Sequence, residues 1–251
     1  MTRRLVLSLL IISLVGIASG CAEDGSSNLR SDTPQPSFPP QVEPYNVEID
    51  PADFVAKIDN PYLPLLPGTT HVYKGASEGE TETVIVAVTR KTKEVLGVTC
   101  TVVRDVARVE GEIVEKTFDW FAQDRYGNVW YFGENSLEYE NGEPAGRAGS
   151  WEAGVDRAQP GIVMLGDPQI GDVYRQEYYL GEAEDMGEVL ALDASVQVPF
   201  GSFSDVLVTA DTTPLEPNVL EHKFYARGVG VVLERSVQGP KGKLELIEVR
   251  P

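Results

Sequence analysis

The chain has 251 residues, of which 39 are Asp or Glu and 21 are Lys or Arg, so its formal net charge is −18. A protein this acidic repels nucleic acid and anionic lipid headgroups, which excludes both as electrostatic partners. Two cysteines, Cys21 and Cys100, are too few for a disulfide-rich scaffold.

The first residues have the layout of a secretory signal. Two basic residues, Arg3 and Arg4, precede an apolar run over residues 5–17, and Ala18-Ser-Gly-Cys21 follows. The thirteen residues of that run are fewer than the roughly 20 that a membrane-spanning helix needs. Residues 1–20 are therefore predicted to be a cleaved signal peptide.

Cys21 directly follows small residues, and this motif resembles the lipobox of bacterial lipoproteins, although Ala18 stands where Leu is more usual. The resemblance implies that the mature protein begins at Cys21 and carries acyl chains, which anchor it to a membrane. Ala22 is not the Asp that would favour retention in an inner membrane. The alternative is an ordinary cleaved signal with a cysteine nearby. Loss of Arg3 and Arg4 with the signal changes the charge from −18 to −20.

Residues 21–45 are rich in Gly, Ser, Asn, Asp and Pro. A segment of this composition buries too little apolar surface to offset chain entropy, so it is predicted to be a disordered tether. Residues 46–251 contain no second linker and no repeat of fixed period. They are predicted to form one β-rich extracytoplasmic domain with a single core.

The clearest element of this domain is an aromatic-rich β-hairpin over residues 118–134. Alternation places Phe118, Trp120 and Ala122 on one face of the first arm, and it places Trp130 and Phe132 on one face of the second. The intervening Asp-Arg-Tyr-Gly-Asn sequence, residues 124–128, has the composition of a reversing loop. Large rings predict a core at this hairpin, not a reaction.

Most of the remaining domain also reads as strands. A short helical turn is predicted within residues 49–56, with Asp50 as its cap and Pro51 near its start. Strands are predicted at 71–75, 81–90, 94–109, 136–140, 173–179, 188–198, 206–212, 221–226, 229–237 and 243–249, with 136–140 edge-like and 141–171 irregular.

Consecutive strands with short Gly-containing turns favour antiparallel pairing, because parallel pairs need long crossovers. The predicted fold is all-β, a single domain with a strongly curved antiparallel sheet of about a dozen strands, barrel-like or a sandwich. A curled sheet of this kind can enclose a cavity for a ligand.

Four short phrases in this domain are similar to those of a group of uncharacterised bacterial secreted proteins and lipoproteins. They are Ile58-Asp-Asn-Pro-Tyr62, Gly149-Ser-Trp-Glu-Ala-Gly154, Tyr174-Arg-Gln-Glu-Tyr178 and Thr213-Pro-Leu-Glu-Pro217. The resemblance implies no activity and transfers no functional residue.

The sequence shows no familiar metal or nucleophile motif, such as His-Glu-x-x-His, Cys-x-x-Cys or Gly-x-Ser-x-Gly, so no catalytic residue, cofactor or metal ligand is assigned. His71 and His222 are expected to be half-buried sheet residues. Cys100 alternates with Val98 and Val102 and is expected to be a buried structural thiol without a disulfide partner.

Carboxylates leave two alternatives open. Glu182, Glu184 and Asp185 cluster after a predicted strand, where they could form a calcium site or a solvated acidic turn. A carboxylate pair could also act in general acid and base catalysis on a glycoside. In that case a tryptophan would stack on the sugar: Trp120, Trp130 or Trp151.

Two charged pairs share strand faces, Arg175 with Glu177 and Glu221 with Lys223. If their strands were neighbours, the four side chains could form an exposed cross-strand network.

The function predicted from the sequence is a non-catalytic, lipid-anchored binding or interaction module of the bacterial cell envelope. Its expected partners are a membrane, through acyl chains on Cys21, and an unidentified small ligand or envelope protein. The alternatives are a secreted carboxylate-dependent hydrolase and a calcium-stabilised structural module.

Overall fold

A computed structural model describes residues 45–251 of the chain. The predicted signal peptide 1–20, the predicted lipidation site Cys21 and residues 22–44 of the predicted tether lie outside the described residues. Within the described part, no helix is long and apolar enough to cross a membrane.

The described chain folds as one antiparallel sheet, and its single helical element is the 3-10 turn η1, Pro51–Asp53. Asp50 caps this turn as predicted, since its Oδ1 accepts a hydrogen bond from the Ala52 N–H at 2.9 Å. The strands are β1 (Phe54–Val55), β2 (Thr70–Ser77), β3 (Glu80–Val95), β4 (Val98–Val109), β5 (Glu112–Asp124), β6 (Val129–Glu140), β7 (Glu143–Gly146), β8 (Trp151–Glu152), β9 (Gln159–Met164), β10 (Val173–Arg175), β11 (Glu177–Tyr178), β12 (Met186–Val198), β13 (Gly201–Thr212), β14 (Leu220–Ala226), β15 (Gly230–Gln238) and β16 (Gly242–Arg250).

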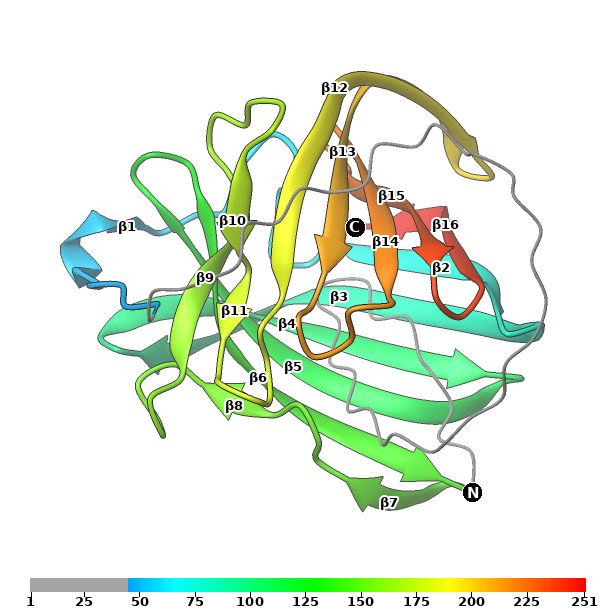
Figure 1. The fold of residues 1–251 in the computed structure, drawn as a ribbon, viewed down its shortest axis with the longest axis horizontal. Helices are drawn as coiled ribbons and strands as arrows, with labels where there is room; N and C mark the ends of the chain where they lie inside the picture. Colours follow the sequence, from blue (N-terminus) through cyan, green and yellow to red (C-terminus); the bar gives the residue numbers. More distant parts are fainter. Residues whose placement is uncertain (1–44) are drawn as a thin grey trace.

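The sheet runs in the order β10-β12-β13-β14-β15-β16-β2-β3-β4-β5-β6-β9-β11, while β1, β7 and β8 lie off this path. In Figure 1, β3–β6 form one wall of a nearly closed barrel, and β12–β14 cross in front of them as the opposite wall. The prediction of an all-β, strongly curved antiparallel sheet in a single domain is confirmed. Of the two shapes left open, the barrel is the one observed.

The two ends of the sheet meet at β10 and β11, which are consecutive in the chain. Val173–Arg175 pairs with β12, whereas Glu177 and Tyr178 pair with β9. One extended stretch therefore joins both edges of the sheet. Gly161 on β9 permits this closure, because a Cβ there would lie 2.4 Å from the carbonyl carbon of Gln176 and 2.5 Å from the carbonyl oxygen of Arg175.

The predicted hairpin is present as β5 and β6, and Gly127 in its loop has φ of +88°. Asp124 holds the loop together: its carboxylate accepts hydrogen bonds from the Asn128 backbone N–H and from the Trp130 Nε1–H, both at 2.9 Å. The face predicted to carry Phe118, Trp120 and Ala122 is not buried along its whole length, because the Phe118 side chain is 37% exposed.

Four predicted boundaries are wrong. The strand predicted at 173–179 is the two strands β10 and β11, which pair with different strands. Leu96 and Gly97 form a turn with positive φ between β3 and β4, so the strand predicted at 94–109 is two strands. The supposed edge strand 136–140 is the second half of β6 and pairs with both β5 and β7. The region 141–171, predicted to be irregular, contains β7, β8 and β9, which are short or held in place by β6.

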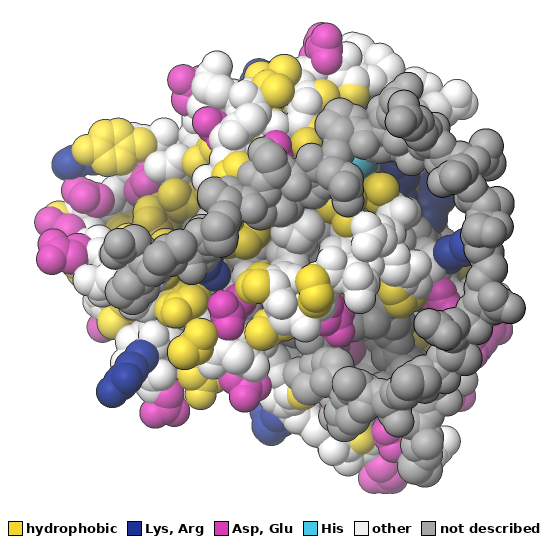
Figure 2. All heavy atoms as spheres, viewed as in Figure 1, with side chains coloured by type: hydrophobic (Ala, Val, Ile, Leu, Met, Phe, Trp, Pro, Cys, Tyr) yellow, Lys and Arg dark blue, Asp and Glu magenta, His cyan; other side chains and the backbone are white. Residues whose placement is uncertain are grey.

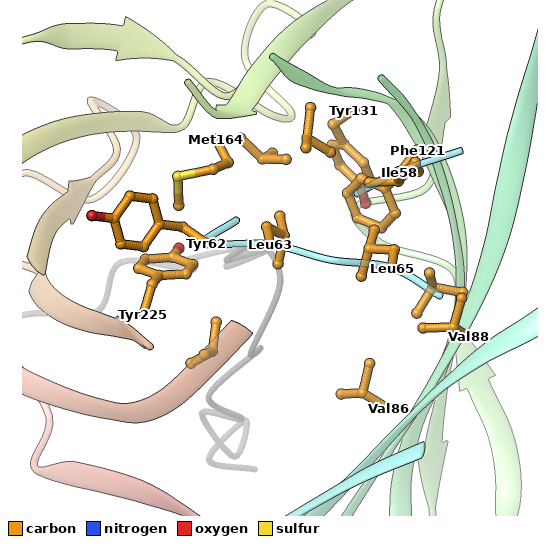
Figure 3. Close-up of a cluster of buried hydrophobic side chains, with 14 of the residues drawn as sticks. Ile58, Tyr62, Leu63, Leu65, Val86, Val88, Phe121, Tyr131, Met164 and Tyr225 are labelled. Atoms are coloured by element: carbon orange, nitrogen blue, oxygen red, sulfur yellow. The ribbon is translucent and has the colours of Figure 1, made fainter. Parts of the chain in front are cut away.

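The segment between η1 and β2 runs through the barrel and fills part of its interior. Figure 3 shows Tyr62, Leu63 and Leu65 between Tyr225 on one side and Phe121 on the other. Asn60 fixes this segment, and it is buried. Its Oδ1 accepts from the backbone N–H of Tyr62 at 2.8 Å, and its Nδ2 donates to the carbonyl of Gly127 at 2.8 Å. A role in packing thus accounts for the Ile58-Asp-Asn-Pro-Tyr62 phrase.

Candidate functional site: an acidic barrel interior

The interior beyond the apolar segment is lined by carboxyl groups. Ten Asp and Glu side chains are buried among residues 45–251, whereas the buried Lys and Arg side chains there are two, Arg175 and Lys223. Most of these acids alternate with core residues along their strands, as Glu82 does with Val84. They therefore belong to the inner face of the sheet.

Strand register assembles the first group, which we call the acid wall. Residues that lie opposite one another on neighbouring strands form rows across β4, β5 and β6. In one row, Thr117 on β5 lies between Asp105 on β4 and Ser136 on β6. In the next row, Asp119 on β5 lies opposite Glu134 on β6. Glu115 and Glu138 form the row before these and are only half-buried. The acid wall comprises Asp105, Glu115, Thr117, Asp119, Glu134, Ser136 and Glu138.

Tyr131 connects two acids of this wall. Its hydroxyl lies 3.0 Å from Oδ1 of Asp119 and 2.9 Å from Oε2 of Glu134. A phenol has one proton to donate, so it can donate to only one of the two carboxyls. The other carboxyl must be protonated and donate to the phenol oxygen. Burial raises the pKa of Asp119 well above its usual range, aided by the nearby Asp105, so the neutral form of Asp119 is favoured.

Glu177, on β11, extends the acid wall at the closure of the barrel. Its Oε2 accepts a hydrogen bond from Trp151 Nε1–H at 2.9 Å, and the Trp151 ring packs edge-on against Tyr131 at 5.3 Å. Burial is the main reason that the pKa of Glu177 is raised well above normal, and Asp185 and Glu134 add to it. The acid wall and β11 therefore share one low-dielectric environment.

The opposite wall carries a second group, which we call the lysine cluster: Thr209, Asp211, Glu221, Lys223 and Glu234 on β13, β14 and β15. Lys223 Nζ lies 3.0 Å from Oδ2 of Asp211 and 3.9 Å from Oε2 of Glu234. Thr209 Oγ1 donates to the other oxygen of Asp211 at 2.6 Å. These contacts identify Lys223 and Asp211 as the ion pair of the cluster.

The other two acids of the lysine cluster favour their neutral forms. Burial raises the pKa of Glu221 to about 7, against the opposing effect of Lys223. Burial also raises the pKa of Glu234 well above normal, and the neighbouring Glu221 adds to it. One lysine cannot compensate three buried carboxylates, so proton uptake neutralises the excess charge.

Several buried carboxyl oxygens have no hydrogen-bond donor among the described residues. They are Oδ2 of Asp105, Oδ2 of Asp119, Oε1 of Glu177, Oε2 of Glu221 and both carboxyl oxygens of Glu234. Unsatisfied polar atoms of this kind are uncommon in folded proteins, because each one typically costs about 1–3 kcal/mol. Their concentration in one interior marks it as the candidate binding site.

The arrangement can bind donors of hydrogen bonds and positive charge. Within residues 45–251, no group of three or more His, Cys, Asp or Glu side chains is placed to hold a metal ion. The suggested calcium cluster separates: Glu182 is exposed, Glu184 accepts from the Gly181 N–H at 2.8 Å, and Asp185 is buried.

The exposed charge network predicted for Arg175, Glu177, Glu221 and Lys223 is wrong, because all four side chains are buried. Their strands are not neighbours in the sheet either. Arg175 lies 4.6 Å from the Tyr178 ring centre.

The three tryptophans do not converge on one sugar-binding surface. Trp151 lies with the interior acids, but Trp120 is covered by Lys93 Nζ at 3.6 Å from its ring, and Trp130 donates to Asp124 in the hairpin loop. The geometry of a carboxylate pair beside stacked aromatic rings is therefore not assembled from the predicted residues.

His71, His222 and Cys100 are all buried. Burial lowers the pKa of both histidines and raises the pKa of the Cys100 thiol to about 12. A thiol in this state is a poor nucleophile, in agreement with the structural role predicted for it.

Sequence reasoning missed Asp105, Asp119, Glu134 and Glu234. A signal was present, because in Glu82-x-Val84-x-Val86 and in Asp105-x-Ala107-x-Val109 an acid occupies the same alternation as core residues. A carboxyl group at an inward position is the feature that indicates a polar interior.

No protein-family model matches the sequence, and no curated protein is significantly similar to it. Two crystal structures are similar in part. A protein from Bacteroides fragilis that is described as exported, with a YmcC-like fold, has 14% identity and a TM-score of 0.44. A protein described as a lipoprotein from Parabacteroides distasonis has 15% identity and a TM-score of 0.43. Each similarity covers 76% of this chain and 99% of the other. At this level, neither structure bears on the ligand, activity or location of the present chain.

Proposed function

We propose that the protein is a non-catalytic, lipid-anchored binding module of the bacterial cell envelope, located outside the cytoplasm. The proposed anchor is Cys21, and it rests on the basic start, the short apolar run and the Ala18-Ser-Gly-Cys21 motif. The proposed binding site is the barrel interior formed by the acid wall and the lysine cluster.

One observation carries the binding proposal: buried carboxyl oxygens on opposite walls have no donor among the described residues. Removing acids from water without partners reduces stability, and proteins depart from good packing mainly at functional sites. A ligand that donates hydrogen bonds to these oxygens would explain why they are there.

The anchor is tested by changing Cys21 to Ala and fractionating the cells. We expect the Cys21→Ala variant to leave the membrane fraction, because two or three acyl chains provide nearly all of the membrane affinity. Cys100→Ala is the matched control and should remain in the membrane fraction. A Cys21→Ala protein that fractionates like the wild type would refute the lipoprotein assignment.

The binding site is tested by native mass spectrometry of the full chain, extracted gently from the envelope in detergent. We expect a stoichiometric additional mass that is lost when Asp105 and Asp119 are both changed to Asn. An additional mass that survives these changes would move the binding site elsewhere on the molecule, and a protein that carries no additional mass would contradict a tightly held ligand.

A further inference from the structure

We propose that the acid wall binds an organic cation through its protonated amino group, and that the ligand enters between the loops at one end of the barrel. This inference rests on the proposed binding function and adds the chemical class of the ligand. The loops that define this acid end are the turns at residues 78–79, 110–111 and 141–142.

The acid wall becomes more buried with depth. Glu115 and Glu138, in the row nearest the acid end, are half-buried, whereas Asp105 and Asp119, in the rows below, are buried. Beyond these rows come Tyr131 and the apolar segment that fills the other end of the barrel. The carboxyl groups of the acid wall therefore extend from the acid end of the barrel toward the apolar segment, and they are more deeply buried closer to it.

The surface around the acid end has the matching charge. Exposed acids lie in or beside its turns: Glu78, Glu110, Glu112, Glu140 and Glu143. On the face shown in Figure 2, acidic side chains are spread over much of the described surface, and basic ones are fewer. Negative charge concentrated on one part of a protein surface raises the local concentration of cations and speeds their association.

An amine fits the acid wall better than the other candidates. A metal ion needs several oxygens converging on one point, and the described residues provide no such group. An anion would find no Lys, Arg or His among the residues of the acid wall to pair with. An ammonium group has three donors and no acceptor, which suits oxygens such as Oδ2 of Asp105 and Oδ2 of Asp119 that lack a donor.

Binding should release protons. Charged and titratable groups face Asp105 and its neighbours from each packed element: Tyr73 on β2, Glu82 on β3, Glu115 and Asp119 on β5, Glu134 on β6, Glu177 on β11, Lys223 on β14 and Glu234 on β15. The carboxyl groups in this interior outnumber its single lysine, so some of them are protonated in the free protein. An entering ammonium group keeps its own proton, and the carboxyl proton that it displaces passes to solvent.

The test is isothermal titration calorimetry of the full chain in detergent with 1,5-diaminopentane, and with 1,5-pentanediol as the uncharged control of similar length. We expect the diamine to bind at pH 8 with net proton release, measured by comparing buffers of different ionisation enthalpy. We expect binding at least about tenfold weaker at pH 5, where the acids hold their protons. The diol should not bind.

Asp105→Asn and Asp119→Asn, each close in shape to the original side chain, should weaken diamine binding by about tenfold or more. Glu245→Gln is the matched control, because Glu245 alternates with the buried Leu244 and Leu246 and pairs with Lys243 on the outer surface. Equal binding of diol and diamine, or binding unaffected by both Asn changes, would overturn the amine assignment.

Failure of this inference is distinguishable from failure of the proposed function. A wild-type protein that shows no heat with the diamine at pH 8, yet retains an uncharged ligand by native mass spectrometry, would overturn the amine class and leave the binding function standing. The pH comparison and the diol control use wild-type protein, so the inference remains testable even if a variant fails to fold.

Discussion

Replacing Glu221 by Gln should change how the stability of the protein depends on pH. Glu221 is buried in the lysine cluster, and its pKa is raised from 4.5 to about 7 in the folded state. Below pH 4.5 the carboxyl is protonated in both states, so it contributes no pH dependence there. Between pH 4.5 and 7 it ionises in the unfolded chain first, so the folded state loses stability as pH rises.

The magnitude follows from the two pKa values. Each tenfold change in proton affinity corresponds to about 1.4 kcal/mol, so the rise from 4.5 to about 7 destabilises the folded state by about 3 kcal/mol at pH 8. Gln cannot ionise and avoids this loss. For a domain of this size, about 3 kcal/mol corresponds to a melting-temperature difference of roughly 6–12 °C.

The assay is thermal unfolding followed by circular dichroism at pH 4 and pH 8. At each pH, the melting temperature of wild type is subtracted from that of Glu221→Gln. We expect this difference to be larger at pH 8 than at pH 4 by roughly 6–12 °C. Glu112→Gln, at an exposed position on β5, is the matched control and should show no such difference. If Glu221→Gln followed the wild type at both pH values, the argument that Glu221 is held neutral by burial would be refuted.

Three further predictions concern the buried ion pair, the closure of the barrel and the buried thiol. Lys223→Met should lower the free energy of unfolding in urea by about 3–5 kcal/mol, because Asp211 loses its buried partner. Adding Asp211→Asn should recover part of that loss. An unchanged urea midpoint for Lys223→Met would contradict the ion pair. Gly161→Ala should lower stability by about 1–3 kcal/mol, because the added Cβ would collide with the backbone of Gln176; wild-type stability would argue against closure at β9 and β11. Cys100, with a pKa raised to about 12, should not react with a thiol reagent until the protein is unfolded; rapid labelling of the native protein would show that the thiol is accessible.

The fold was predictable because its signals are local. The alternation of Val84, Val86 and Val88 predicts a strand, and the Gly-containing sequence at residues 124–128 predicts a turn. Neither prediction needs any knowledge of contacts between residues far apart in the chain. Boundaries failed where two strands are joined by a very short turn, as at Leu96 and Gly97, because β-branched residues continue on both sides of it. They also failed in region 141–171, where pairing with β6 imposes strand geometry on a sequence with little strand preference.

The candidate site was less predictable because it depends on closure of the sheet. Glu177 and Lys223 lie on strands that are not adjacent, and they share one interior only once β10 and β11 join the two edges. The sequence identified Glu177, Glu221 and Lys223 as charged strand residues, but it placed them on the surface. Charge on an alternating strand is usually exposed, and register alone does not say which face of a sheet is closed into an interior.

The most direct test of an acidic interior is an infrared pH titration of the full chain. Neutral carboxylic acids absorb separately from carboxylates, so buried protonated acids can be observed at pH 7, where exposed Asp and Glu are ionised. We predict a neutral-carboxyl band at pH 7 that decreases in Asp119→Asn and in Glu221→Gln but not in Glu112→Gln. A spectrum at pH 7 with no such band would contradict the acidic interior on which the binding proposal depends.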